Sequence, residues 1–210
     1  MQKEFREKKE EKEYKQDINN KFFKERKVIF KGQKKEAQVV ENIDVFFLPK
    51  DITKDDLDKI RTHLRSQDRE KNLEQLGDIK VFKHLQKHNI IVTSGRSVLT
   101  RLLAGDTTYT GEITRGALGD GVADVVNGRT TLVNEVYRKV TASQTFDSNV
   151  AYVDFFYEAT DVDGTFTEFG NFIDGTDTPD DGVLWSYIDT GGWVKPNTQS
   201  LFVACRYTIV

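Results

Sequence analysis

A run of glycines is the first pattern in this chain that could do chemistry, because glycine-rich loops bind phosphate groups through their backbone amides. The run reads Gly116-Ala117-Leu118-Gly119-Asp120-Gly121. Its order is G-x-x-G-x-G, not the dinucleotide-binding order G-x-G-x-x-G, and no helix pattern follows that would direct its N-terminus at a phosphate. The sequence therefore disfavours nucleotide binding, and we expect these glycines to form a tight turn with positive φ angles.

Two acidic patterns could bind a cation. Asp161-Val162-Asp163-Gly164 resembles the start of a calcium loop, which also needs a third oxygen ligand before its glycine and a bidentate glutamate near position 12. Since Asp-Gly between two strands is a strong hairpin signal, we expect a hairpin turn, with a weak cation site as the alternative. For the acidic loop we expect a solvated loop, with a cation site between subunits as the alternative; its carboxylates are Asp174, Asp177, Asp180 and Asp181.

A pair of histidines, His84 and His88, has the i,i+4 spacing that presents two imidazoles on one face of a helix. A third ligand and a catalytic glutamate are missing beside them, so we expect an exposed helix face. The chain has no G-x-S-x-G elbow, and its single cysteine, Cys205, alternates with apolar residues in a strand-like run. We therefore predict no catalytic residue, no metal site and no cofactor, and we expect that the protein is not an enzyme.

The charge distribution divides the chain near residue 89. Residues 1–88 hold 23 Lys+Arg and 18 Asp+Glu, a balance of +5, whereas residues 89–210 hold 8 and 16, a balance of −8. The acidic second part argues against nucleic-acid binding there, because phosphate contact needs a basic surface. We also expect no signal peptide and no membrane span, since no apolar run is long enough for either.

The first part is predicted to consist of two segments. Residues 1–26 form a charged helical or disordered extension, in which Tyr14, Ile18 and Phe22 make a thin apolar stripe that could bind a neighbouring subunit. Residues 27–88 form a small α+β arm with two or three strands before Pro49. A helix then runs from an N-cap at Thr53 to about residue 72, and a short helix covers 79–85.

The second part, residues 89–210, is predicted to be an antiparallel β-sandwich, Ig-like or jelly-roll-like, with a leading helix at 95–104. Ser94 is the expected helix cap and Gly105 the stop signal. After the helix the apolar period becomes two, as in 151–159 and 201–209, and turn residues separate the strands. Alternation puts Trp185 and Tyr187 on one face in the core. Trp193, in a turn after two glycines, is the expected interface aromatic, with packing over the sandwich edge as the alternative.

The landmarks of residues 93–210 resemble a module of tailed-bacteriophage virion proteins. They are Thr93-Ser94-Gly95-Arg96 leading into Leu99, Arg101-Leu102-Leu103-Ala104-Gly105-Asp106, the glycine run at 116–121, Glu135-Val136-Tyr137-Arg138-Lys139, Phe155-Phe156 with Ala159, Gly164-Thr165-Phe166-Thr167-Glu168-Phe169-Gly170, and a final strand from Leu201 to Val210. The resemblance implies that the helix at Arg96–Ala104 plugs one end of the sandwich. It also implies that Glu135 and Arg138 flank the start of a central strand.

The resemblance implies a structural subunit of a virion, in the tail, baseplate, neck or fibre-attachment region. Its expected partners are other virion proteins and copies of itself, and it would be assembled in the host cytoplasm. Two alternatives are a receptor- or glycan-binding or capsid-decoration module, with a host receptor as partner, and, less favoured, a tail-associated cell-wall hydrolase. The hydrolase stays an alternative because the chain has many carboxylates, and the catalytic pair of a glycosidase consists of two carboxylates.

Overall fold

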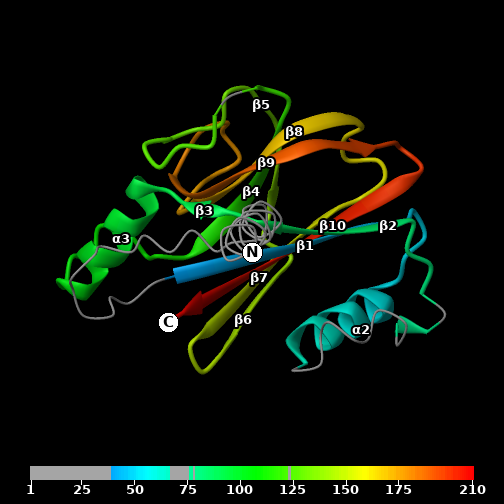
Figure 1. The fold of residues 1–210 in the computed structure, drawn as a ribbon, viewed down its shortest axis with the longest axis horizontal. Coiled ribbons are helices and arrows are strands. Elements are labelled where there is room, and N and C mark those ends of the chain that lie inside the picture. The colour runs from blue at the N-terminus through cyan, green and yellow to red at the C-terminus, as the bar shows by residue number, and fades with distance from the viewer. Residues whose placement is uncertain (1–38, 67–75, 78, 123) are drawn as a thin grey trace, which may run out of the picture. The chain divides into compact units, whose positions relative to one another are not determined.

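The computed structural model describes residues 39–66, 76–77, 79–122 and 124–210 (Figure 1). In these residues the chain is mainly β, with two antiparallel five-stranded sheets and two longer helices. The predicted antiparallel β-sandwich is thereby confirmed. The predicted extension at 1–26, with Tyr14, Ile18 and Phe22, and the first predicted strands near residue 28 lie outside the described residues.

The first sheet has β1 and β10 near its centre. Its strand order is β2 (Lys83–His88), β1 (Val39–Pro49), β10 (Gln199–Ile209), β7 (Val150–Tyr157) and β6 (Ser143–Asp147). β1 and β10 pair along their whole length, from Val39 opposite Ile209 to Pro49 opposite Gln199. Two strands far apart in the sequence thus form the middle of this sheet.

The second sheet has the order β3 (Ile90–Ile91), β9 (Val183–Lys195), β8 (Gly164–Ile173), β4 (Ile113–Gly119) and β5 (Glu135–Val140). Asn171 pairs with Ser186 and Phe172 with Leu184, so Trp185 is an extra residue, a β-bulge. The bulge turns Trp185 into the core between the sheets, whereas Tyr187 packs on the outer face. The prediction that both rings share one face is therefore wrong.

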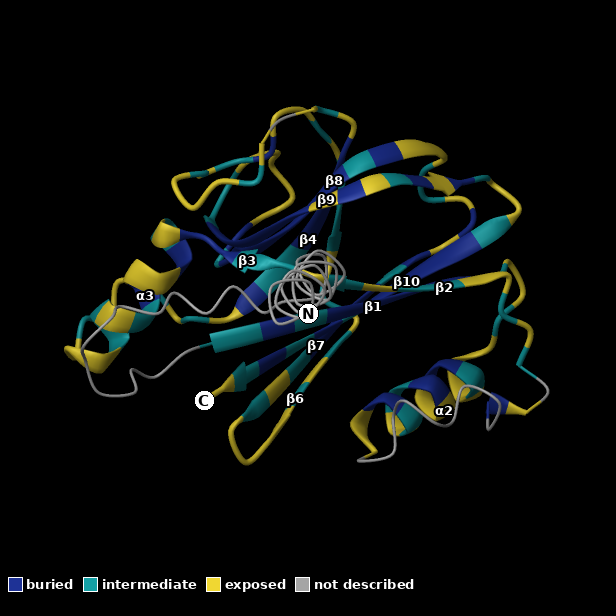
Figure 2. Cartoon of the chain, viewed as in Figure 1, coloured by how far each residue is buried: buried dark blue, intermediate teal, exposed yellow. Residues whose placement is uncertain are grey.

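In the described residues, three apolar clusters hold the layers together. The largest lies between the sheets and includes Val45, Phe155 and Phe169. The second packs helix α2 (Lys54–Arg65) against the outer face of the first sheet, through Leu57, Ile60 and Leu64. The third covers the outer face of the second sheet with residues of the loop before β5. Figure 2 shows the buried residues along the strands and on α2. Each sheet is therefore covered on both faces over much of its area.

The start of α2 agrees with the sequence. Thr53 accepts a hydrogen bond from the Asp56 amide, while the Asp56 side chain bonds back to the Thr53 amide, which is a capping box. Asp55 and Asp56 lie in the first turn, where carboxylates interact favourably with the helix dipole. The described helix ends at Arg65, and residues 67–72, which the prediction also included, lie outside the described residues.

Two other predictions for the first part of the chain are wrong. Residues 83–88 form strand β2, not the end of a helix at 79–85, because they pair with β1 from Asn42 to Phe47. The boundary at residue 89 does not separate an arm from the sandwich. β1 completes the first sheet and residues 38–210 form one compact unit, so the change in charge marks no structural division.

Helix α3 (Thr93–Leu103) lies at one end of the two sheets (Figure 1). Gly105 has a φ of 81°, which confirms it as the stop signal. The predicted cap at Ser94 is wrong, since Val92 is the N-cap and the Ser94 hydroxyl donates to the Leu184 carbonyl. A Cβ on Gly95 would lie 2.7 Å from the Trp185 backbone, so this glycine lets α3 pack closely on β9.

Candidate functional site

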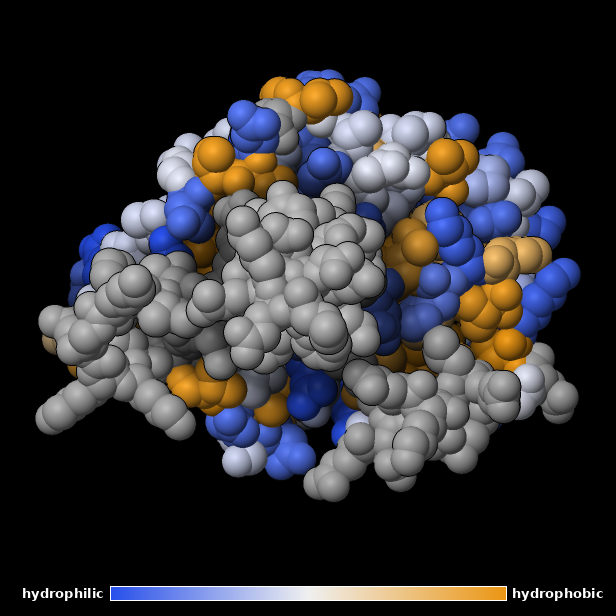
Figure 3. Space-filling view, viewed as in Figure 1, coloured by the Kyte–Doolittle hydropathy of each residue, from blue (hydrophilic) through white to orange (hydrophobic). Residues whose placement is uncertain are grey.

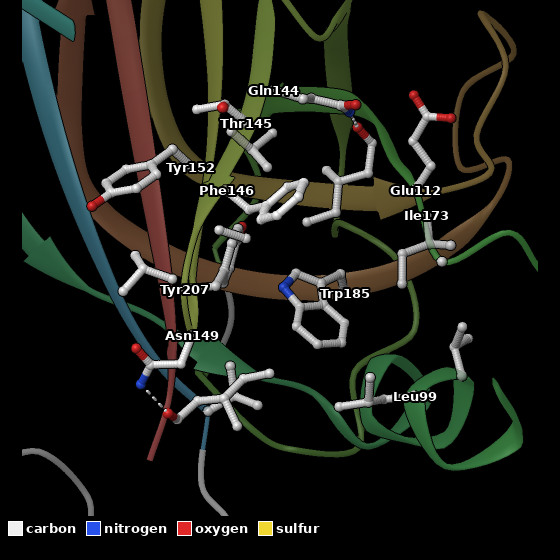
Figure 4. Close-up of a pocket in the computed structure, with 18 of the residues that line it drawn as sticks. Leu99, Glu112, Gln144, Thr145, Phe146, Asn149, Tyr152, Ile173, Trp185 and Tyr207 are labelled. Atoms are coloured by element: carbon white, nitrogen blue, oxygen red, sulfur yellow. Dashed lines mark hydrogen bonds between the residues drawn. The ribbon is translucent and has the colours of Figure 1, made fainter. Parts of the chain in front are cut away.

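An apolar cleft of about 490 Å³ opens between α3 and the end of the first sheet (Figure 4). Figure 4 shows Leu99 on α3, Phe146 on β6 and Trp185 on β9 around the same cavity. The residues that line it are Val39, Val98, Leu99, Leu102, Gly111, Glu112, Ile113, Gln144, Thr145, Phe146, Ser148, Asn149, Val150, Ala151, Tyr152, Val153, Ile173, Trp185, Tyr207 and Ile209.

The chemistry of the apolar cleft is contact with apolar groups. Glu112 is the only charged side chain among the lining residues, and Gln144 uses its amide to bond the Ile113 carbonyl. Phe146 is 81% exposed at the mouth, and Leu99 is only partly buried. Cavities of this volume and character bind apolar ligands or partner side chains, and this one offers no pair of groups for acid–base catalysis.

A buried polar cluster lies in the core, and it shares Tyr207 with the lining of the apolar cleft. The Asn171 amide donates to the Tyr207 hydroxyl at 2.6 Å and to the Ser186 hydroxyl at 3.0 Å. Ser186 donates in turn to a Glu41 carboxyl oxygen at 3.3 Å. Burial raises the pKa of Glu41 from 4.5 to about 8, so its carboxyl is largely protonated at neutral pH.

Cys205 belongs to the same cluster, with its sulfur 3.4 Å from the Asn171 amide nitrogen. Its side chain is buried, as the alternation of the last strand predicts. Burial raises the thiol pKa well above its usual value, which keeps the sulfur protonated. Since the thiolate is the nucleophile, this cysteine is unreactive in the folded protein.

The glycine run has a packing role that the sequence did not reveal. Its glycines do not have positive φ angles, so the predicted tight turn is wrong. Glu168 is fully buried and accepts hydrogen bonds from the backbone amides of Gly121, Val133 and Asn134, and from the Tyr187 hydroxyl. A Cβ on Gly119 would lie 2.6 Å from a Glu168 carboxyl oxygen. The glycines therefore allow the loop to close over this carboxylate.

A second buried pair holds the acidic loop. Arg138 bonds both oxygens of Glu135 and donates to the carbonyls of Thr176 and Asp181, while the Asp180 amide donates to Glu135. The prediction of a solvated loop is correct only for side chains such as Asp177, which is exposed. Strand β5, which begins at Glu135, is an edge strand, so the implied central position is wrong.

The predicted cation positions serve other contacts. Asp161 accepts a hydrogen bond from Lys139 at 2.6 Å, and its turn joins β7 to β8 in the other sheet, so it is not a hairpin. His84 lies on β2 with its ring 3.0 Å from Asp44. Among the described residues, no group of three or more His, Cys, Asp or Glu side chains could hold a metal ion. Neither described helix is long and apolar enough to cross a membrane.

Of the four predicted interface residues, the structure describes one. Trp193 is 1% exposed and packs in the core against Phe169, next to an irregular stretch of β9 in which Gly191 and Gly192 have positive φ. It therefore cannot form an exposed interface, and the prediction is wrong. Sequence reasoning missed the apolar cleft, since Phe146 stands alone in a polar strand and gave no apolar pattern.

Comparison of the chain with family models, with curated proteins and with solved structures found no match.

Proposed function

We propose that this chain is a structural subunit of a tailed-bacteriophage virion and that it acts by binding other virion proteins. The observation that carries the proposal is the ordered set of landmarks from Thr93 to Val210, which resembles a module of such virion proteins. The region would be the tail, baseplate, neck or fibre attachment, with assembly in the host cytoplasm.

The contacts of the landmark residues support this function. Glu168 and the Glu135–Arg138 pair use their charges to fix two loops on one sheet. These side chains are buried and their hydrogen-bonding groups are paired, so they stabilise the loops and are not reactive groups. Loops that are fixed by buried charged side chains suit the rigid subunit of an assembly.

The apolar cleft supports binding to protein. Most of its lining side chains are apolar, so it can bury apolar side chains of a partner. Phe146 at its mouth is an aromatic anchor of the kind that contributes strongly to protein interfaces.

The test is to look for the chain in purified particles of the phage whose genome encodes it. Quantitative mass spectrometry should find it in a fixed ratio to the other structural proteins, and particles made without it should lack one defined part in electron micrographs. Absence from particles would refute the proposal. Cell-wall cleavage that depends on one carboxylate would instead establish the hydrolase, and specific glycan binding would establish the receptor-binding alternative.

A further inference from the structure

The apolar cleft leaves apolar surface uncovered in the described part of the chain. Leu99 and Leu102 of α3 are only partly buried, and Phe146 and Ile209 on the opposite side are exposed. Beside Phe146, β6 is an edge strand whose described partner is β7 alone. Exposed apolar side chains that surround a cavity are typical of a surface that a partner covers.

The charges of the chain indicate which kind of partner fits. Residues 39–210 hold 18 Lys+Arg and 26 Asp+Glu, a balance of −8, and residues 1–38 hold 13 and 8, a balance of +5. The only charged residue in the lining, Glu112, is acidic, and Asp147 follows Phe146 on β6. A partner segment that is apolar and basic would match both the cavity and the charges around it.

The chain itself contains such a segment. Residues 21–35 carry seven Lys+Arg and one glutamate, a balance of +6, together with Phe22, Phe23 and the run Val28-Ile29-Phe30. This segment precedes Val39, the first described residue, which itself lines the apolar cleft. About nine residues separate Phe30 from Val39, enough to span roughly 30 Å when extended, so the segment can reach beyond its own domain.

We propose that residues 21–35 of a second copy of this chain dock in the apolar cleft. This inference rests on the proposed function as an assembly protein and names one of its partners. In this arrangement the aromatic and aliphatic side chains enter the cavity, and the lysines and arginines pair with Glu112 and Asp147. Because the segment and the cleft are different surfaces, the contact is heterologous and joins copies head to tail into a ring or a filament.

Cross-linking of the full chain tests the inference. The chain carries Phe30→p-benzoylphenylalanine, and ¹⁵N-labelled and unlabelled copies are mixed in equal amounts before irradiation. We expect cross-links from position 30 to peptides of α3 or β6, with labelled and unlabelled partners joined in the same product. Links only within one copy, links to other surfaces or no links would overturn the proposal.

A matched pair of variants gives a second measurement. Phe146→Asp changes an exposed side chain at the mouth and should lower the association constant at least tenfold in sedimentation velocity, while the circular dichroism spectrum stays unchanged. Val122→Asp is the control, because Val122 is 86% exposed and does not line the apolar cleft. Normal assembly of Phe146→Asp would refute the docking even if the chain is found in virions, so the two proposals fail separately.

Discussion

Replacing Glu41 with glutamine should make the protein more stable at neutral pH. Glu41 lies on β1 in the core, is 3% exposed, and has one carboxyl oxygen without a hydrogen-bond partner among the described residues. Desolvation opposes its ionisation, and this raises its pKa from 4.5 to about 8, despite hydrogen bonds from Tyr207 and Ser186. Glutamine has nearly the same shape and no proton to lose.

The magnitude follows from the proton balance. Below pH 4.5 the carboxyl is protonated in both the folded and the unfolded chain, and its contribution to stability is complete. Between pH 4.5 and about 8 only the unfolded chain ionises, so the free energy of unfolding falls with rising pH. At about 1.4 kcal/mol per pH unit, the loss is about 3 kcal/mol at pH 7 and about 5 kcal/mol at pH 8.

Urea unfolding of the wild type and of Glu41→Gln at pH 5, 6, 7 and 8 measures this loss. The stability of the variant minus that of the wild type should increase with pH by about 1.4 kcal/mol per unit. Glu112→Gln, at an exposed carboxylate, is the control and should show no such trend. A constant difference between Glu41→Gln and the wild type across this range would refute the reasoning.

Three further predictions concern the fold. Residues 89–210 alone should lack a cooperative thermal transition by circular dichroism, whereas residues 38–210 should show one, because β1 pairs with β10 and β2; a cooperative 89–210 fragment would contradict this. Gly116→Ala should lower the free energy of unfolding in urea by about 1–3 kcal/mol, because its Cβ would lie 2.7 Å from the Phe155 ring. Gly128→Ala is the control and should be nearly neutral, since a Cβ there meets no atom within 4 Å. Equal stabilities of the two variants would contradict the packing at Gly116. Cys205→Ala should lower the free energy of unfolding by about 1 kcal/mol. The native thiol should react with Ellman's reagent only on unfolding, and rapid labelling of the folded protein would show that the thiol is accessible.

Local sequence patterns predicted the helices and strands that have clear capping residues or a clear periodicity of apolar residues. Thr53 and the acidic residues after it indicated the start of α2, and Leu57, Ile60 and Leu64 its buried face. The alternation in 201–209 gave β10, whose Leu201, Val203 and Cys205 are buried. These signals are local because caps and periodicity depend on a few neighbouring residues.

Long-range contacts escaped prediction for a physical reason. A glutamate in a strand is expected to lie on the surface. Glu41 is instead in the core, where it contacts Asn171 and Ser186 of the opposing sheet. The bulge at Trp185 reverses the face of one side chain without any change in sequence pattern. The apolar cleft forms because α3 lies beside β6 and β7, which follow it by about forty residues or more in the sequence. Local residue spacing cannot predict such a contact.

The pairing of β1 with β10 has a consequence for synthesis on the ribosome. β1 leaves the ribosome early, but its partner follows only after residue 199, so Val45, Phe46, Phe47 and Leu48 must wait while most of the domain is translated. An unpaired strand of this kind is prone to aggregation, and a chain released early cannot cover it. We therefore expect the nascent protein to need a chaperone, and truncated products to be degraded instead of joining an assembly.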